Sequence, residues 1–149
     1  MQAVFHWPLR VYYEDTDTGG VVFYANYLKF FERARTEWLR AAGVGQQSLA
    51  VSDKVMFVVK STAIDYHLPG LLDDQISVSV VVKKLGRASV EFDQQAWRIG
   101  GVEPQLLCSG SIRVGCVDTQ SLRPVGIPAH VLARLGQSHV LANDLHQNL

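Results

Sequence analysis

With 149 residues, of which 48% are hydrophobic, the chain is long enough for one domain with a hydrophobic core. Its 14 basic and 14 acidic residues cancel to a net charge of zero, which argues against the basic excess of nucleic-acid and membrane-surface proteins. No apolar run approaches the roughly 20 residues that span a bilayer, and the N-terminal MQAVFHWPLR lacks the apolar core of a signal peptide.

The chain opens with a predicted strand over residues 3–14. Val11, Tyr12 and Tyr13 have the β-branched and aromatic character typical of strands. Pro8 restricts this strand to the edge of a sheet or to a bulge, because proline has no N–H to donate. Gly19-Gly20 then interrupts the pattern and permits backbone conformations with positive φ.

One long helix is predicted from about Asn26 to Gly43, where glycine is suited to end it. Its apolar residues recur at helical spacing and take up much of the circumference. These residues are Tyr27, Leu28, Phe30, Phe31, Ala34, Trp38, Leu39 and Ala41. Because such a wide apolar surface is typical of buried helices, we expect this one to be buried on most of its sides.

Four further strands are predicted at residues 55–64, 76–83, 88–99 and 106–117, with a loop or short helical turn at 46–52 and a short helix at 128–135. Short connections between the strands favour antiparallel neighbours. One apolar helix against one antiparallel sheet is an α+β design, in which a curling sheet buries the helix. We expect a single domain over residues 1–149, with a polar tail at about 137–149 that frays.

The two cysteines, Cys108 and Cys116, fall on one apolar face of the last predicted strand. Eight residues of extended chain separate them by roughly 26 Å, so they cannot form a disulfide with each other. Their surroundings favour core packing over nucleophilic chemistry. Reduced cysteines predict a cytoplasmic protein.

Three carboxylates, Glu14, Asp15 and Asp17, stand just before the predicted helix. A helix N-terminus offers unpaired N–H groups and a partial positive charge, which stabilise a carbonyl oxygen that becomes negative during attack. A carboxylate beside it either attacks an acyl carbon or deprotonates a water that attacks. Asp17 therefore fits ester or thioester hydrolysis, although a simple turn and cap explains the local sequence equally well. In an extended strand Asp15 faces the same side and is the alternative.

Other catalytic patterns are missing from the sequence. No histidine forms a metal-ligand pair with a carboxylate at helical spacing, so no metal site is predicted. Neither a Gly-x-Ser-x-Gly motif nor a phosphate-binding glycine loop occurs. His67, beside Asp65 in a predicted loop, is interpreted as a structural residue.

Residues 11–43 resemble the signature of the hotdog-fold acyl-CoA thioesterases of the 4-hydroxybenzoyl-CoA thioesterase group, and within it the YbgC-type, Tol-Pal-associated enzymes. The resemblance is carried by Tyr13-Glu14-Asp15-Thr16-Asp17, Gly20-Val21-Val22, Asn26-Tyr27 and Glu32-Arg33-Ala34-Arg35. It continues more weakly through Asp65-Tyr66 and Leu72-Asp73-Asp74 to about residue 125. It implies a hotdog fold, in which a curved antiparallel sheet of five or more strands wraps one long central helix.

The same resemblance assigns roles to individual residues. It implies that Asp17 is the catalytic carboxylate and that a backbone N–H at about Tyr24 stabilises the oxyanion. YbgC-type relatives usually carry His where this chain has Tyr24, so the backbone role is retained without an imidazole. The implied substrate-binding residues are Gly20, Val22, Phe23, Asn26 and Tyr27, and the implied coenzyme A-binding residues, at the turn between the third and fourth strands, are Lys84 and Arg87.

The leading hypothesis is an acyl-CoA thioesterase that releases a carboxylic acid and coenzyme A without a metal or bound cofactor. An acyl carrier protein is the alternative thioester donor. A hotdog hydratase or dehydratase needs a histidine base, and none lies between His6 and His67. A non-catalytic acyl-thioester binding protein is a further alternative, against which the intact Asp17 argues. Since exposed strand edges are a liability that pairing removes, and the resemblance implies edge-to-edge pairing, we expect a homodimer or homotetramer.

Overall fold

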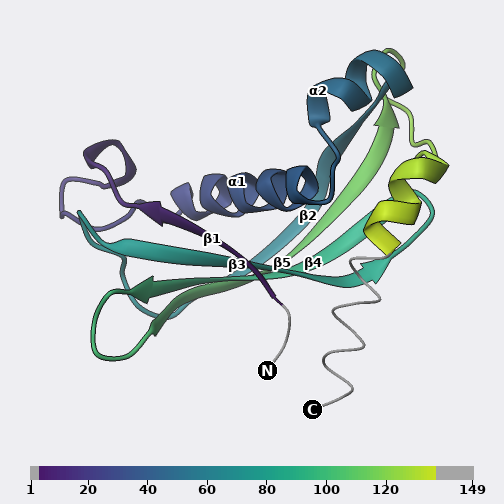
Figure 1. The fold of residues 1–149 in the computed structure, drawn as a ribbon. Coiled ribbons are helices and arrows are strands. Elements are labelled where there is room, and N and C mark those ends of the chain that lie inside the picture. The colour runs from purple at the N-terminus through teal and green to yellow at the C-terminus, as the bar shows by residue number, and fades with distance from the viewer. Residues whose placement is uncertain (1–3, 137–149) are drawn as a thin grey trace.

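The computed structural model describes residues 4–136, which form one antiparallel sheet with a long helix across its face (Figure 1). The strands are β1 (Phe5–Arg10), β2 (Val55–Tyr66), β3 (Gln75–Leu85), β4 (Ser89–Ile99) and β5 (Gln105–Asp118). Their order in the sheet is β1-β3-β4-β5-β2, so β1 and β2 are the edges. The expected α+β design is confirmed, and Pro8 lies in an edge strand, where its missing N–H is tolerated.

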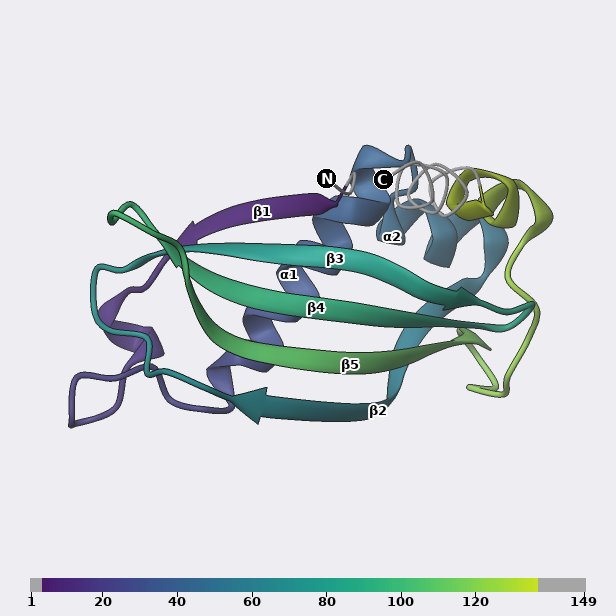
Figure 2. The same cartoon turned by 90° about the horizontal axis from the view of Figure 1, so that it is seen from below.

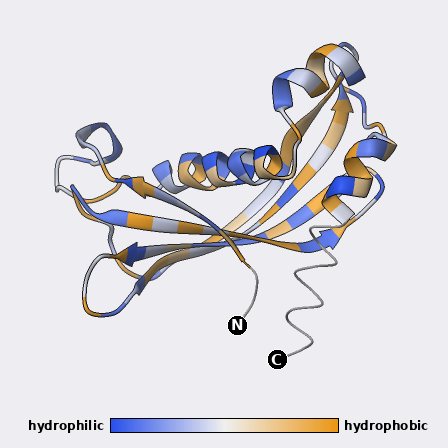
Figure 3. Ribbon diagram, viewed as in Figure 1, coloured by the Kyte–Doolittle hydropathy of each residue, from blue (hydrophilic) through white to orange (hydrophobic). Residues whose placement is uncertain are grey.

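The sheet is curved, and its strands alternate between hydrophobic and hydrophilic residues (Figures 2 and 3). Consecutive strands β3, β4 and β5 are antiparallel neighbours, as expected. The same expectation is wrong for β2 and β3, because β2 pairs with β5 at the far edge. The connection at residues 67–74 therefore crosses the end of the sheet, where an isolated bridge joins Val21 to Leu71.

Helix α1 (Asn26–Ala41) has one strongly apolar face, which lies against the sheet. The buried side chains on this face are Tyr27, Phe30, Phe31, Ala34, Trp38 and Leu39. Gly43, at φ +83°, ends the helix as predicted, because its positive φ lets the Val44 N–H turn back to the Leu39 carbonyl.

The opposite face of α1 is open to solvent. Leu28 is 44% exposed, and Lys29, Glu32 and Arg33 are exposed with it. The prediction that the helix is buried on most of its sides is therefore wrong for the single chain, because the open sheet covers only one face (Figure 1).

The first strand is shorter than predicted, since β1 ends at Arg10 and residues Tyr13–Asp15 form a 3₁₀ turn, η1. After α1 come the short helix α2 (Gln46–Ser48) and a π-helical turn, η2 (Leu49–Asp53). The predicted C-terminal helix is present at residues 129–136, and its Val131 and Leu135 are buried in the core. The tail at 137–149 lies outside the described residues.

Candidate active site

Asp15 is a buried carboxylate that joins the η1 turn to the start of α1. Its side chain accepts hydrogen bonds from the Tyr12 backbone N–H at 2.9 Å and from Asn26 Nδ2 at 2.6 Å. The residue is only 5% exposed. The expectation that Asp15 and Asp17 face the same side is wrong, because residues 13–15 form a 3₁₀ turn instead of a strand. Asn26, which the resemblance implies as a substrate-binding residue, is buried, and its side-chain amide donates to Asp15.

Asp17 is exposed and lies in the tight turn that Gly19-Gly20 makes. One oxygen of its carboxylate accepts a hydrogen bond from the Gly19 N–H at 2.9 Å, and Gly20 adopts φ +79°, as the glycine pair predicted. Within residues 4–136 the other oxygen has no hydrogen-bond donor. Asp17 therefore presents a carboxylate oxygen that is open to a ligand.

The residues between this turn and α1 run alongside Asp17. The Asp17 N–H donates to the Val21 carbonyl at 2.9 Å, and the Phe23 N–H donates to the Asp15 carbonyl at 2.9 Å. Among the described residues, the N–H groups of Tyr24 and Ala25, which immediately precede α1, find no acceptor. These donors carry the partial positive charge of the helix end and are suited to bind a developing oxyanion.

A hollow of about 310 Å³ opens at this end of the helix. It is lined by Val22, Tyr24, Tyr27, Tyr66, His67, Leu68 and Pro69. The Tyr24 and Tyr66 rings meet edge to face with centroids 6.1 Å apart, and the Tyr66 hydroxyl donates to the Tyr24 carbonyl at 3.1 Å. Aromatic residues thus make up much of the hollow's lining, which includes Tyr24, and the exposed Phe23 ring contacts the Tyr24 ring in a tilted arrangement with centroids 4.8 Å apart.

Tyr27 lines the hollow and is tied to the β2–β3 connection. Its hydroxyl accepts a hydrogen bond from the Gly70 N–H at 3.1 Å. Burial, with a smaller contribution from Cys108, raises the pKa of Tyr27 to about 12, so the phenol keeps its proton at neutral pH. Burial likewise raises the pKa of Cys108 to about 12, which agrees with the predicted packing role of that thiol.

His67, interpreted from the sequence as a structural residue, lines this hollow. Its Nε2 lies 3.0 Å from Ser109 Oγ, and its ring lines the hollow near Tyr24. The absence of a histidine between His6 and His67 in the sequence therefore does not mean that none lies near the helix start. The histidine is 43 residues from Tyr24 in the sequence, and only the crossing of the β2–β3 connection brings the two together.

Lys84 and Arg87 are exposed at the turn between β3 and β4, as predicted. This turn and the Asp17 turn lie at opposite ends of the sheet (Figures 1 and 2). The ten residue steps of β3 correspond to roughly 33 Å. One chain does not bring these cations to Asp17.

Comparison with known proteins adds independent information. The family model of the Thioesterase superfamily matches residues 19–105, more than half of the chain. This chain belongs to the thioesterase superfamily. Acyl-CoA thioesterase YbgC of Haemophilus influenzae is 44% identical over 129 residues, covering 87% of this chain and 92% of the relative. Acyl-CoA thioester hydrolase YbgC of Escherichia coli is 40% identical over 135 residues, covering 91% of this chain and 98% of that relative.

Solved structures agree with this membership and confirm the expected hotdog fold. A probable thioesterase from Bartonella henselae matches the chain with a TM-score of 0.77 at 29% identity, covering 85% of this thioesterase and 100% of that chain. A mutant of 4-hydroxybenzoyl-CoA thioesterase, complexed with 4-hydroxybenzoyl-CoA, matches with a TM-score of 0.82 at 18% identity. The match covers 88% of this thioesterase and 97% of that chain. At that identity the second likeness concerns the fold alone.

Two further observations concern the part of the thioesterase that the structure describes. No helix within it is long and apolar enough to cross a membrane. Residues 4–136 also contain no group of three or more His, Cys, Asp or Glu side chains arranged to hold a metal ion.

Proposed function

We propose that this thioesterase hydrolyses acyl-CoA thioesters to a carboxylic acid and coenzyme A, with Asp17 as its catalytic carboxylate. The observation that carries the proposal is that Asp17, with an open carboxylate oxygen, lies on a segment whose backbone hydrogen bonds to Val21 and Phe23 tie it to the residues that lead to the unpaired N–H groups of Tyr24 and Ala25. The curated relatives at 40–44% identity are named as acyl-CoA thioesterases or acyl-CoA thioester hydrolases. An acyl carrier protein in place of coenzyme A remains the alternative donor.

In this proposal the thioester carbonyl points its oxygen at the N–H groups of Tyr24 and Ala25. Asp17 acts either as nucleophile, forming an acyl anhydride that water cleaves, or as general base for an attacking water. In both routes the C–S bond breaks, the thiolate of coenzyme A leaves and takes up a proton, and the acyl group gains an oxygen from water. The helix end stabilises the oxyanion of the tetrahedral intermediate.

The aromatic hollow receives the acyl group. Val22, Tyr27 and the exposed Phe23 contribute apolar surface next to the carbonyl position, and Gly20 lets the Asp17 turn close tightly. Asn26 contributes indirectly, because its amide holds Asp15 and with it the turn. Hydrolysis of this kind needs neither a metal nor a bound cofactor.

The test of the proposal is Asp17→Asn, which keeps the size of the side chain and removes the carboxylate. We expect kcat for acyl-CoA hydrolysis to fall by about 10²-fold or more, the usual effect of losing a general base. Glu14→Gln is the matched control, since Glu14 is an exposed carboxylate of the preceding η1 turn. Full activity of a folded Asp17→Asn variant in a thiol-release assay would show that Asp17 is not the catalytic group.

Coenzyme A binding and assembly are linked in our proposal. We infer that Lys84 and Arg87 hold the phosphates of a coenzyme A whose thioester lies in the site of a second copy, because one chain keeps them far from Asp17. The 12-residue edge strand β2 has no second strand neighbour among the described residues and offers a surface for pairing. A homodimer, or a homotetramer of two dimers, follows. We place the enzyme in the cytoplasm, where its two free cysteines stay reduced.

A further inference from the structure

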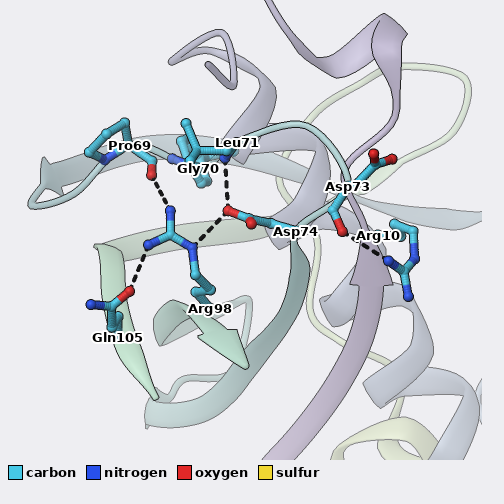
Figure 4. Close-up of polar contacts among 9 residues, drawn as sticks. Arg10, Pro69, Gly70, Leu71, Asp73, Asp74, Arg98 and Gln105 are labelled. Carbon is cyan, nitrogen blue, oxygen red and sulfur yellow. Dashed lines mark hydrogen bonds and ion pairs between the residues drawn. The ribbon is translucent and has the colours of Figure 1, made fainter. Parts of the chain in front are cut away.

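The β2–β3 connection is held on one side by the guanidinium of Arg98, near the end of β4 (Figure 4). Arg98 Nε donates to Asp74 Oδ2 at 2.7 Å, and a second nitrogen donates to the Pro69 carbonyl at 2.5 Å. Its third nitrogen donates to Gln105 Oε1 on β5 at 2.7 Å. The side chains of Arg98 and Asp74 are only 23% and 18% exposed. All three nitrogens of one rigid fork are thus engaged, which fixes the connection against the sheet.

The other side of the same connection holds the segment that leads into α1. The Gly70 carbonyl accepts a hydrogen bond from the Val22 N–H at 2.8 Å, and the Gly70 N–H donates to the Tyr27 hydroxyl at 3.1 Å. Asp74 closes the connection internally by accepting from the Leu71 N–H at 2.8 Å. Gly70, together with the Val21–Leu71 bridge, is therefore a point of contact between the part that Arg98 holds and the residues around the proposed oxyanion donors.

The contact at Gly70 leaves no room for a side chain. A Cβ atom at this position would lie 2.8 Å from the Tyr27 hydroxyl and 2.9 Å from Val22 Cγ2. Because the backbone of the connection approaches both side chains so closely, a shift of the connection is transmitted to Val22 and Tyr27. Val22 is two residues before Tyr24, whose N–H is the proposed oxyanion donor.

We propose that Arg98 and Asp74 are positioning residues for hydrolysis, acting through Pro69 and Gly70 on the segment 22–24. This inference rests on the proposed function, since it assigns these residues to the geometry of the same site. Neither side chain touches the substrate in this arrangement. Their effect is on the alignment of the oxyanion donors, where a misplacement of about 1 Å costs up to roughly 10²-fold in rate.

The first experiment measures kcat, KM and thermal stability for Arg98→Met and for Asp53→Asn. Arg98→Met keeps an unbranched apolar chain but loses every donor. We expect kcat to fall at least ~10-fold with KM within ~2-fold, as for an interaction that matters in the transition state. Asp53→Asn is the control, because it weakens the Asp53–His130 contact of 2.9 Å at the opposite end of β2, and its kcat should stay unchanged. An unchanged kcat in a folded Arg98→Met variant overturns the proposal.

Two conservative variants distinguish the contribution of the planar shape of the Arg98 guanidinium from that of its positive charge. In Arg98→Lys a single ammonium cannot reach Asp74, Pro69 and Gln105 together, so kcat should remain low. Asp74→Asn removes the charge of the other partner in the Arg98–Asp74 ion pair and should also lower kcat. This variant tests the same proposal if Arg98→Met does not fold. Full recovery of kcat in Arg98→Lys overturns the role of the fork.

The decisive measurement repeats Arg98→Met in the Asp17→Asn background. Because Arg98 acts on the oxyanion donors, which still stabilise the tetrahedral intermediate when the Asp17 carboxylate is gone, its fold-effect on kcat should stay within ~3-fold of its value in the wild-type background. Disappearance of the effect there would show that Arg98 acts through Asp17 and would overturn its proposed action on the oxyanion donors. If Asp17→Asn alone proves fully active, the proposed role of Asp17 fails, whereas a kcat loss in the Arg98→Met single variant still supports positioning.

Discussion

Asp15 and Asp17 are separated by one residue, and the turn gives their side chains opposite environments. Asp15 is 5% exposed, with both oxygens bonded to donors of the protein. Asp17 is exposed and keeps one oxygen open. The 3₁₀ turn at Tyr13–Asp15 causes this difference, because it rotates Asp15 inward beneath the start of α1. A structural carboxylate and a candidate catalytic one thus lie side by side.

Replacing Asp15 by Asn tests the structural half of this pair. The amide nitrogen that replaces one oxygen faces a donor, either the Tyr12 N–H or Asn26 Nδ2, and loses that hydrogen bond. We expect the free energy of unfolding to fall by about 1–3 kcal/mol, the cost of an unsatisfied buried polar group. Denaturant unfolding measures this directly, with Glu14→Gln as the control. Unchanged stability of Asp15→Asn contradicts the assigned role.

Among the elements, α1 does most to position the site, because its buried face fixes where its N-terminus points. Phe31 packs so tightly on β5 that a Cβ on Gly110 would lie 2.8 Å from its ring. Trp38 meets Phe92 of β4 edge to face, with centroids 5.3 Å apart. The helix is anchored along its length by aromatic contacts with the central strands.

This anchoring predicts an asymmetric response to substitution along α1. Phe31 is fully buried, so Phe31→Ala should lower the free energy of unfolding by about 3–5 kcal/mol through lost burial and a cavity. Lys29→Ala, on the exposed face, should change it by no more than about 0.5 kcal/mol. Chemical denaturation of both variants provides the comparison, and equal losses would contradict the one-sided burial of the helix.

At the scale of the whole molecule, a single chain holds the carboxylate turn at one end of the sheet and the basic β3–β4 turn at the other. The aromatic side chains that line the hollow are also open to solvent in the single chain, with Tyr24 63% and Tyr66 48% exposed. These features are explained together if the working enzyme is an assembly in which a second copy brings Lys84 and Arg87 to the substrate.

The prediction at this scale joins assembly with coenzyme A binding. Sedimentation at working concentrations should show a dimer or tetramer and no monomer. Reversing both charges, Lys84→Glu with Arg87→Glu, should raise KM for acyl-CoA several-fold, and the effect should shrink as salt screens the phosphates. Lys29→Glu with Lys54→Glu is the charge-matched control at exposed positions. An unaltered KM would remove Lys84 and Arg87 from the binding site.

Local patterns in the sequence predicted most of the elements and indicated the segment that holds the candidate site. Helical spacing predicted α1, glycine at positive φ predicted the turns at Gly20 and Gly43, and alternation predicted the strands. The Asp17 turn was also found, because a carboxylate before a helix start is a feature of neighbouring residues. Each of these depends on backbone preferences and periodicity that act over a few residues.

The tertiary structure decided everything that depends on residues far apart in the chain. The pairing of β2 with β5, the place of His67 beside Tyr24, and the contact of Gly70 with Tyr27 all follow from one crossing connection. The burial of Asp15 depends on an amide 11 residues later. Sequence periodicity shows which residues are apolar, but which distant segments meet is decided by packing, because only the folded sheet and helix determine where a connection can cross.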